Sequence, residues 1–306
     1  MGYNSYMGIF ISIASYRDPE LLYTVQNCYD QASDKGGLFF SIISQADYEE
    51  HPDLSFIPPN QIRYHKVSWQ KSLGACWARE IASRRIDQDF FLQIDSHSRF
   101  IKDWDKVVTN SYIKNEKYWG DMVYTHHPNG FEKINGKDVY DNKIQQQPNY
   151  STAIWSDEAR MLQPVWYFTE PSEYGYESMY VCANSFFCRS EIIKQVPYDK
   201  NLYFIGEEPS LTLRLYTRNI RIVNPPMNYM FHMYNPTYKK VDRKLHWEDN
   251  ASWADMNKKS YERLAKIMTG DMSMAVYGIG SISKYEEFKD KIGVNLDDKY
   301  DQMYNW

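Results

Sequence analysis

The chain has 306 residues, of which 43% are hydrophobic and 16% aromatic, so it can bury the core of one large α/β domain or of two smaller ones. Its net charge of -5 argues against a general polyanion-binding protein, because nonspecific affinity for nucleic acid comes from Lys and Arg side chains that neutralise phosphates. No apolar run approaches the roughly 18 residues of a membrane span, and no signal peptide is recognisable, so we expect a cytoplasmic protein without a membrane anchor. The cysteines lack C-x-x-C spacing and are predicted to be buried free thiols: Cys28, Cys76, Cys182 and Cys188.

Strands and helices alternate along the first half of the chain. Residues 7–14 predict a first strand. Asp18 and Pro19 then predict the N-cap and the first position of a helix that runs to about Gln31. Two further strands are predicted at 38–44 and 62–67. This alternation is typical of a mainly parallel, doubly wound sheet.

A second helix is predicted to start at Ser72, its N-cap, and to lead directly into the next strand. Leu73, Trp77 and Ile81 recur at helical spacing and would share one face of this helix. The strand that follows, at 90–95, is largely apolar, as expected for a strand buried on both faces in the middle of a parallel sheet.

The second half of the chain is less regular. Residues 126–180 contain many Asn, Gln, Tyr and Pro residues with little periodicity, which indicates a long functional insertion or a small antiparallel patch. The elements predicted around it are helices at 104–119, 207–218 and 250–268 and strands at 121–124, 181–189, 220–224 and 229–233. The helix at 250–268 is predicted to end at Gly270, and a tail follows.

The most informative feature is the end of the strand at 90–95. Because successive side chains of an extended backbone point to opposite faces, Asp95 and His97 should project the same way and could bind one ion. Open α/β sheets place their ligands at the carboxyl ends of central strands, and a carboxylate with an imidazole suits manganese, zinc or iron better than calcium. The alternative is an Asp that caps the next turn beside a solvated His.

Several motifs together resemble one enzyme family over nearly the whole chain. The motifs are Ser15-Tyr16-Arg17-Asp18, Gly74 with Trp77-Ala78-Arg79, Gln93-Ile94-Asp95-Ser96-His97, Gly206-Glu207-Glu208 with Arg214-Leu215-Tyr216-Thr217-Arg218, and Phe231-His232-Met233-Tyr234. They resemble GT-A glycosyltransferases, and more narrowly the N-acetylglucosaminyltransferase family whose eukaryotic members modify hydroxyproline on a cytoplasmic ubiquitin-ligase subunit. The resemblance implies an α/β fold of GT-A type, with a Rossmann-like, mainly parallel nucleotide-binding sheet flanked by helices, an irregular acceptor-side insertion and a helical C-terminal tail.

The resemblance also implies a division of the chain and a reaction. A GT-A catalytic domain would cover 1–234, with a nucleotide-binding half at 1–125 and an acceptor half at 126–234, and a C-terminal helical extension at 235–306 would pack on it. The enzyme would transfer a sugar, GlcNAc from UDP-GlcNAc, to a hydroxyl acceptor with retention of configuration. The alternatives are a metal-dependent phosphoesterase, which would need an Asn-His element that is absent here, and an inactive sugar-binding protein on the same fold.

Particular side chains receive roles from the same resemblance. Asp95, His97 and His232 would hold a divalent cation, Mn²⁺, which neutralises the diphosphate leaving group. The nucleotide sugar would contact Ser15, Arg17, Asp18, Arg79, Gln93 and Asp95. Trp166 and Asn184 would contact the acceptor or the transferred sugar.

Glu207 and Glu208, an acidic pair that opens a helix, would be catalytic by orienting or deprotonating the acceptor hydroxyl. The sequence does not choose between them, and the helix macrodipole favours carboxylates at a helix start even without a function. A plain salt bridge would equally explain Arg79, and core packing would explain His232 or Trp166. The acceptor stays open among a protein, a polysaccharide and a modified nucleobase.

Overall fold

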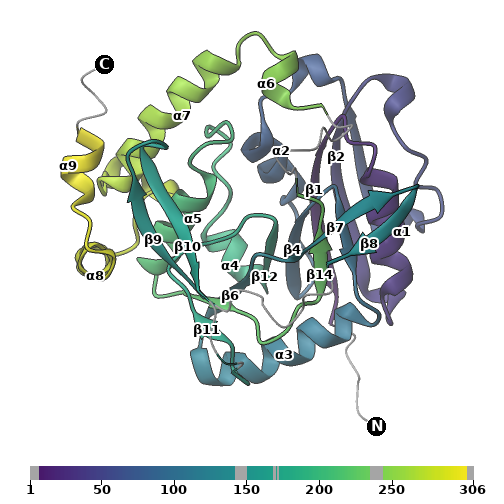
Figure 1. Cartoon of the computed structure of the whole chain (residues 1–306), viewed down its shortest axis with the longest axis horizontal. Helices are drawn as coiled ribbons and strands as arrows, with labels where there is room; N and C mark the ends of the chain where they lie inside the picture. The colour runs from purple at the N-terminus through teal and green to yellow at the C-terminus, as the bar shows by residue number, and fades with distance from the viewer. Residues whose placement is uncertain (1–6, 142–149, 168–169, 171, 235–243, 302–306) are drawn as a thin grey trace.

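The computed structural model describes residues 7–141, 150–167, 170, 172–234 and 244–301. A mixed eight-stranded sheet runs through the molecule (Figure 1). Its strands, in spatial order, are β11 (Tyr176–Glu177), β13 (Arg221–Asn224), β6 (Met122–Thr125), β12 (Ser185–Arg189), β4 (Phe90–Asp95), β1 (Ile9–Tyr16), β2 (Leu38–Gln45) and β3 (Ile62–Val67). Two helices pack on one face, α1 (Leu21–Gln31) and α3 (Trp104–Trp119). Three helices pack on the other, α2 (Ala75–Ala82), α4 (Ser190–Gln195) and α5 (Glu207–Tyr216).

The half of the sheet built from the start of the chain is parallel. β1 pairs in parallel with β2 and β4, and β2 pairs in parallel with β3. Ile11 and Ile13 of β1 face the α1 side while Phe10 faces the α4 side, and all three are fully buried. Coverage on both faces explains the continuous apolar sequence of these strands. The predicted strands are confirmed to within two residues at each end: 7–14, 38–44, 62–67 and 90–95.

The predicted N-cap of the first helix is wrong. α1 follows Glu20 rather than Asp18. The Asp18 carboxylate has other partners, because Oδ1 accepts the backbone N–H of Glu20 at 2.9 Å and Oδ2 accepts the hydroxyl of Ser96 at 2.7 Å. The side chain is thus directed toward the end of β4.

The predicted N-cap of the second helix is also wrong. α2 follows Gly74, and Leu73 lies outside the helix with 52% of its surface exposed. The hydroxyl of Ser72 instead donates to Gln45 at 2.6 Å. Gly74 has a φ of +103° and packs so closely on Tyr203 that a Cβ would lie 2.5 Å from it. The start of α2 is therefore determined by this close backbone approach.

The other half of the sheet is mostly antiparallel. β12 is inserted antiparallel between β4 and β6, and β13 runs parallel to β6. The strand predicted at 181–189 begins only at Ser185, because the backbone N–H of Val181 donates to the hydroxyl of Thr212 on α5 and that of Cys182 donates to Thr125. Because β12 runs opposite to both of its neighbours, β4 and β6, the sheet is mixed rather than parallel.

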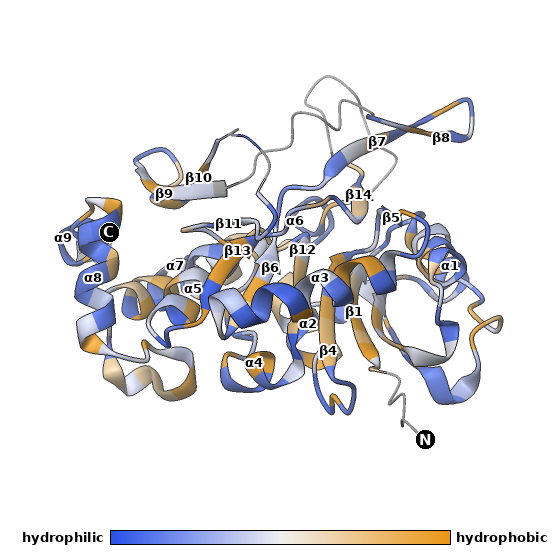
Figure 2. Cartoon of the chain, turned by 90° about the horizontal axis from the view of Figure 1, so that it is seen from below, coloured by the Kyte–Doolittle hydropathy of each residue, from blue (hydrophilic) through white to orange (hydrophobic). Residues whose placement is uncertain are grey.

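The described residues between 126 and 180 include two antiparallel hairpins, in line with one of the two outcomes predicted for this region. β7 (Asn129–Ile134) and β8 (Lys137–Tyr140) make one hairpin, which joins a small sheet with β5 (Ser98–Phe100) and β14 (Met230–His232). β9 (Tyr150–Ser156) and β10 (Met161–Tyr167) make a second hairpin. Figure 2 shows both hairpins above the end of the main sheet at which β1 and β4 finish.

Residues 244–301 are mainly helical, as predicted for the C-terminal part of the chain. The helices are α6 (His246–Asp249), α7 (Trp253–Met268), α8 (Ile282–Ile292) and α9 (Leu296–Asp301). Leu264 of α7, Phe288 of α8 and Tyr300 of α9 share one apolar cluster with Leu213 of α5 and Leu162 of β10. The division of the chain at residues 234 and 235 stays a prediction.

The four cysteines are buried and free, as predicted. Within the described ranges, every helix is too short or too polar to cross a lipid bilayer.

Candidate active site

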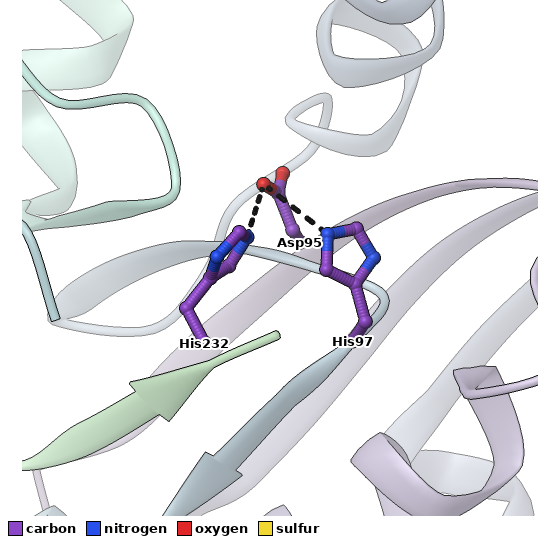
Figure 3. A group of neighbouring side chains, drawn as sticks. All are labelled: Asp95, His97 and His232. Carbon is purple, nitrogen blue, oxygen red and sulfur yellow. Dashed lines mark hydrogen bonds and ion pairs between the residues drawn. The ribbon is translucent and has the colours of Figure 1, made fainter. Parts of the chain in front are cut away.

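Three side chains with metal-binding atoms meet where β4 ends (Figure 3). Asp95, His97 and His232, here named the metal triad, each offer one ligand atom, and these atoms lie within 4.8 Å of one another. Oδ2 of Asp95 lies 3.0 Å from Nε2 of His232 and 3.9 Å from Nε2 of His97. The structure therefore brings together the three residues that the sequence analysis proposed as metal ligands.

Backbone hydrogen bonds join the two segments that carry the metal triad. β5 begins at Ser98, directly after His97, and pairs antiparallel with β14, so that Ser98 lies opposite His232. The N–H of Met233 donates to the carbonyl of His97 at 3.0 Å. This pairing explains how a histidine far along the chain reaches the end of β4.

The carboxylate of Asp95 is held from behind by a buried chain of ion pairs. Oδ1 accepts from the Arg79 guanidinium at 2.5 Å, and Arg79 also donates to the buried carboxylate of Glu207. Burial opposes the charge of Asp95, but the guanidinium and the two nearby imidazoles outweigh it and hold the pKa of this carboxyl well below its usual range. Asp95 is therefore ionised at neutral pH, with Oδ1 bound to Arg79 and Oδ2 facing the imidazoles.

Asp18 holds the second ligand, His97, in a defined orientation. Nδ1 of His97 lies 2.7 Å from Oδ2 of Asp18, whose side chain is only 2% exposed. Burial opposes the charge of Asp18, but His97 and the Ser96 hydroxyl lower its pKa to about 2, so Asp18 acts as an acceptor. An Nδ1–H that donates to Asp18 leaves the lone pair of Nε2 directed toward Asp95, which is the usual arrangement of a metal-binding histidine.

The donor set fits a divalent transition-metal ion. With metal–ligand bonds of about 2.1 Å, two ligand atoms at right angles lie about 3 Å apart, close to the separation between Asp95 and His232. One carboxylate and two imidazoles leave further coordination positions open, and they suit manganese, zinc or iron better than calcium. The side chains of Asp95, His97 and His232 are 21%, 12% and 8% exposed, so part of the triad reaches solvent.

The two glutamates at the start of α5 have different surroundings. Glu207 is buried against Arg79 and lies 3.6 Å from the thiol of Cys76, so it supports the ion-pair chain behind Asp95. Glu208 is only half-buried, and its Oε1 accepts the N–H of Ala183 at 2.9 Å. Burial raises the pKa of Glu208 to about 7, a value at which a carboxyl group can exchange a proton with a bound hydroxyl. These surroundings favour Glu208 as the member of the pair that meets substrate.

The remaining residues predicted to contact the nucleotide sugar have partners within the protein. Ser15 is buried, and its carbonyl accepts from the Gln45 amide at 3.1 Å. Gln93 has no exposed surface, and its side chain accepts the hydroxyl of Tyr198 at 2.7 Å. The guanidinium of Arg17 is paired with three carboxylates, Asp47, Glu50 and Asp249. Nucleotide contacts by these residues stay predictions.

The predicted acceptor residues Trp166 and Asn184 are connected by two residues that the sequence analysis did not assign to the acceptor. The ring of His127 meets Trp166 edge-on at 5.5 Å and stacks on Tyr234 at 4.4 Å, 4° from parallel. The Asn184 amide donates to the Tyr234 hydroxyl at 3.4 Å. Tyr234 also lies 4.4 Å from the ring of His232. We name Trp166, His127 and Tyr234 the aromatic wall, and it ends at the metal triad.

Two solved structures with related folds were found by structural comparison. One is GalNAc-T7 with UDP, GalNAc and Mn²⁺, with a TM-score of 0.63 and 13% identity over 98% of this chain; the chain spans 56% of that protein. Another is the mannosyltransferase PcManGT from Pyrobaculum calidifontis in complex with GDP-Man and Mn²⁺, with a TM-score of 0.51 and 8% identity, covering 96% of this chain and 73% of that one. At such low identities these similarities establish the GT-A fold and nothing further.

Sequence comparison identifies the family. Residues 8–57 and 53–294 match the family model described as Glycosyltransferase (GlcNAc). No curated protein matches the chain. Because the family match covers most of the sequence and the architecture is that of GT-A enzymes, the chain belongs to the glycosyltransferase (GlcNAc) family.

Proposed function

We propose that the protein transfers a sugar, GlcNAc from UDP-GlcNAc, to a hydroxyl group of an acceptor, with retention of configuration and with Mn²⁺ as cofactor. Family membership supports sugar transfer, and the GlcNAc donor and the retention follow from the family resemblance. The similar structures of GalNAc-T7 and PcManGT contain Mn²⁺ together with UDP and GalNAc or with GDP-Man, which supports a nucleotide-sugar donor and a metal.

The metal triad is the observation that carries the proposal. Its three ligand atoms converge at the carboxyl end of β4, where open α/β sheets bind their ligands. A bound divalent cation would supply Lewis-acid stabilisation of the diphosphate that leaves when the sugar is transferred. Asp95, His97 and His232 would hold this ion, and the buried Arg79, itself held by Glu207, keeps Asp95 charged and oriented.

Glu208 supplies the acceptor side of the proposed reaction. Its half-buried carboxyl is oriented by the N–H of Ala183, and its pKa near neutrality allows it to accept a hydrogen bond or a proton from the incoming hydroxyl. Asn184 follows Ala183 directly and precedes β12. Its amide can bind a sugar hydroxyl. The narrower expectation, transfer to hydroxyproline of a ubiquitin-ligase subunit, stays a prediction from the resemblance.

Calorimetric titration with UDP, in the presence and absence of Mn²⁺, tests the metal dependence. We expect UDP affinity to require the ion in the wild type and to fall at least tenfold in Asp95→Asn, because the substitution removes the charged ligand. Asp87→Asn is the matched control, since Asp87 is an exposed aspartate just before the opposite end of β4. Equal UDP affinity with Mn²⁺ and with a chelator would contradict the proposal.

Turnover distinguishes an enzyme from a sugar-binding protein on the same fold. UDP release from UDP-GlcNAc, compared with UDP-glucose, UDP-galactose and UDP-GalNAc, should be fastest for UDP-GlcNAc and should be abolished by a chelator. The anomeric configuration of the product, read by NMR, tests retention. Metal-dependent UDP binding without release of UDP from any of the four donors would identify an inactive binder.

A further inference from the structure

We propose that the aromatic wall is an acceptor subsite for a neutral saccharide, so that the hydroxyl glycosylated by this protein belongs to a carbohydrate rather than to the hydroxyproline that the family resemblance implies. This inference rests on the proposed function and specifies its acceptor. The three rings of the wall contact one another in sequence and extend from β10 to the metal ligand His232.

Hydrogen bonds brace the wall at its centre. The Tyr234 hydroxyl donates to the carbonyl of Pro128 at 2.8 Å, lies 2.9 Å from Nδ1 of His127 and accepts from the Asn184 amide. These contacts join the segment just before β12, the segment before β7 and the residues after β14. A ring fixed from three segments is a preorganised surface, which loses little entropy when a ligand stacks on it.

The rings remain accessible to a ligand. Trp166, His127 and Tyr234 are each half-buried rather than enclosed. Trp166 lies opposite Ser151 in the β9–β10 hairpin, which Figure 2 shows on the same upper side of the molecule as β14. Because Tyr234 contacts the metal ligand His232, a ring ligand on the wall would lie next to the reacting centre.

The charge around the wall favours a neutral ligand over a phosphate-bearing one. Burial lowers the pKa of His127, so its imidazole is neutral at physiological pH. The hydrogen-bond partners of Tyr234 are likewise uncharged, including the carbonyl of Pro128 and the amide of Asn184. The chain as a whole carries a net charge of -5, which disfavours a nucleic acid acceptor.

The polar groups beside the wall match the hydroxyls of a sugar ring. A pyranose has an apolar C–H face, which stacks on aromatic rings, and an edge of hydroxyls that need donors and acceptors. Asn184 offers an amide, and Glu208 offers a carboxyl with a pKa of about 7. Stacking surface and hydrogen-bonding edge occur together here, next to the metal triad.

Saturation-transfer NMR on the wild type with UDP and Mg²⁺, which is used in place of Mn²⁺ because it is diamagnetic and does not broaden ligand signals, tests the class of acceptor. The probes are methyl glycosides of neutral hexoses and N-acetylhexosamines, a hydroxyproline peptide, and an oligonucleotide with a hydroxymethylated base. We expect transfer to the ring protons of at least one glycoside and none to the peptide or the oligonucleotide. Signals from the peptide or the oligonucleotide alone would overturn the inference.

Kinetics with the preferred glycoside then test the wall itself. Trp166→Ala should raise the acceptor KM at least tenfold while changing the donor KM much less, and Trp166→Phe, which keeps a stacking ring, should recover most of the loss. Trp155→Ala is the control, because Trp155 lies in the same hairpin but packs on Tyr300 under Lys299. Equal effects of Trp166→Ala and Trp155→Ala on the acceptor KM would show a structural role and overturn the inference.

The failure of this inference can be distinguished from failure of the proposed function. If UDP binds without metal, or if no UDP sugar is turned over, the proposed function fails and the acceptor question does not arise. If UDP-GlcNAc is turned over with Mn²⁺ but no glycoside accepts the sugar, only the saccharide subsite is wrong.

Discussion

The two sides of the metal triad are built from different chemistry. On the β4 and α2 side, Asp95, Arg79 and Glu207 form a buried chain of full charges, each compensated by the next. On the other side, His127 and Tyr234 present neutral rings, and Glu208 has a pKa near neutrality. Fixed charges suit a charged nucleotide donor, whereas neutral stacking surfaces suit an uncharged acceptor. We therefore expect substitutions on the two sides to differ in their effects on stability and ligand binding.

The largest expected effect is on the charged side. Arg79→Met would leave Asp95 and Glu207 as buried carboxylates without their cation, and it should lower the free energy of unfolding by about 3–5 kcal/mol. Arg84→Met is the control: Arg84 is more than half exposed, and loss of its ion pair with Glu80 should cost less than about 1 kcal/mol. Urea unfolding measures both, and similar losses would remove the distinction between buried and exposed pairs.

The next largest effect is a pH dependence on the acceptor side. The pKa of Glu208 is raised from 4.5 to about 7 by burial, so the folded state favours the protonated carboxyl. Its contribution to stability is fully present below about pH 4.5 and is lost as the pH rises through about 7. Relative to Glu208→Gln, the wild type should therefore lose at most about 3 kcal/mol between pH 4.5 and pH 8. Urea unfolding with a chelator present checks this, and parallel pH profiles would contradict it.

A smaller effect is expected for the group behind His97. Asp18→Asn weakens the acceptor for the His97 Nδ1–H and should reduce Mn²⁺ affinity about 10- to 100-fold. Asp53→Asn is a matched control. Asp53 accepts a hydrogen bond from the backbone N–H of Ser55, two residues later, in the same way that Asp18 accepts one from Glu20. Unlike Asp18, Asp53 lies at the surface. Calorimetric titration with Mn²⁺ measures both variants. An unchanged affinity in Asp18→Asn would mean that Asp18 does not position a metal ligand.

The smallest expected effect concerns Arg17 and the nucleotide. Arg17 is paired with Asp249 of α6 at 3.0 Å, and both side chains are less than a fifth exposed. If Arg17 contacts a donor phosphate, Asp249 competes for it, and Asp249→Asn should increase UDP affinity about two- to fivefold, as expected for a partly exposed pair worth about 1 kcal/mol or less. Asp255→Asn, at the exposed start of α7, is the control. A decrease in UDP affinity would argue that Asp249 itself binds the donor.

Local sequence patterns predicted the charged side better than the neutral side. The strand at 90–95 was readable because it is apolar along its length, and its alternation placed Asp95 and His97 on one side of the backbone. The caps at Asp18 and Ser72 were mispredicted because their side chains bond to Ser96 and Gln45, which are distant in sequence. Short-range rules cannot detect such a competing partner.

The neutral side gave weaker signals. Tyr234 belongs to the Phe231-His232-Met233-Tyr234 motif, but nothing in that motif indicated a role for Tyr234 beside the metal triad. Nothing in the local sequence indicated an acceptor role for His127, because a histidine among irregular residues has no periodicity from which a partner can be inferred. Its stacking on Tyr234 depends on the approach of the segment after β6 to the end of β14.

Residue order alone determined the alternating strands and helices, the carboxylate and imidazole at the end of β4, and the family motifs, because each depends on neighbours a few positions away. The tertiary structure decided that His232 joins Asp95, that Arg79 and Glu207 stand behind it, and that Glu208 and the aromatic wall lie on the acceptor side. These positions depend on strand pairing and burial between segments far apart in the chain, which no local pattern encodes.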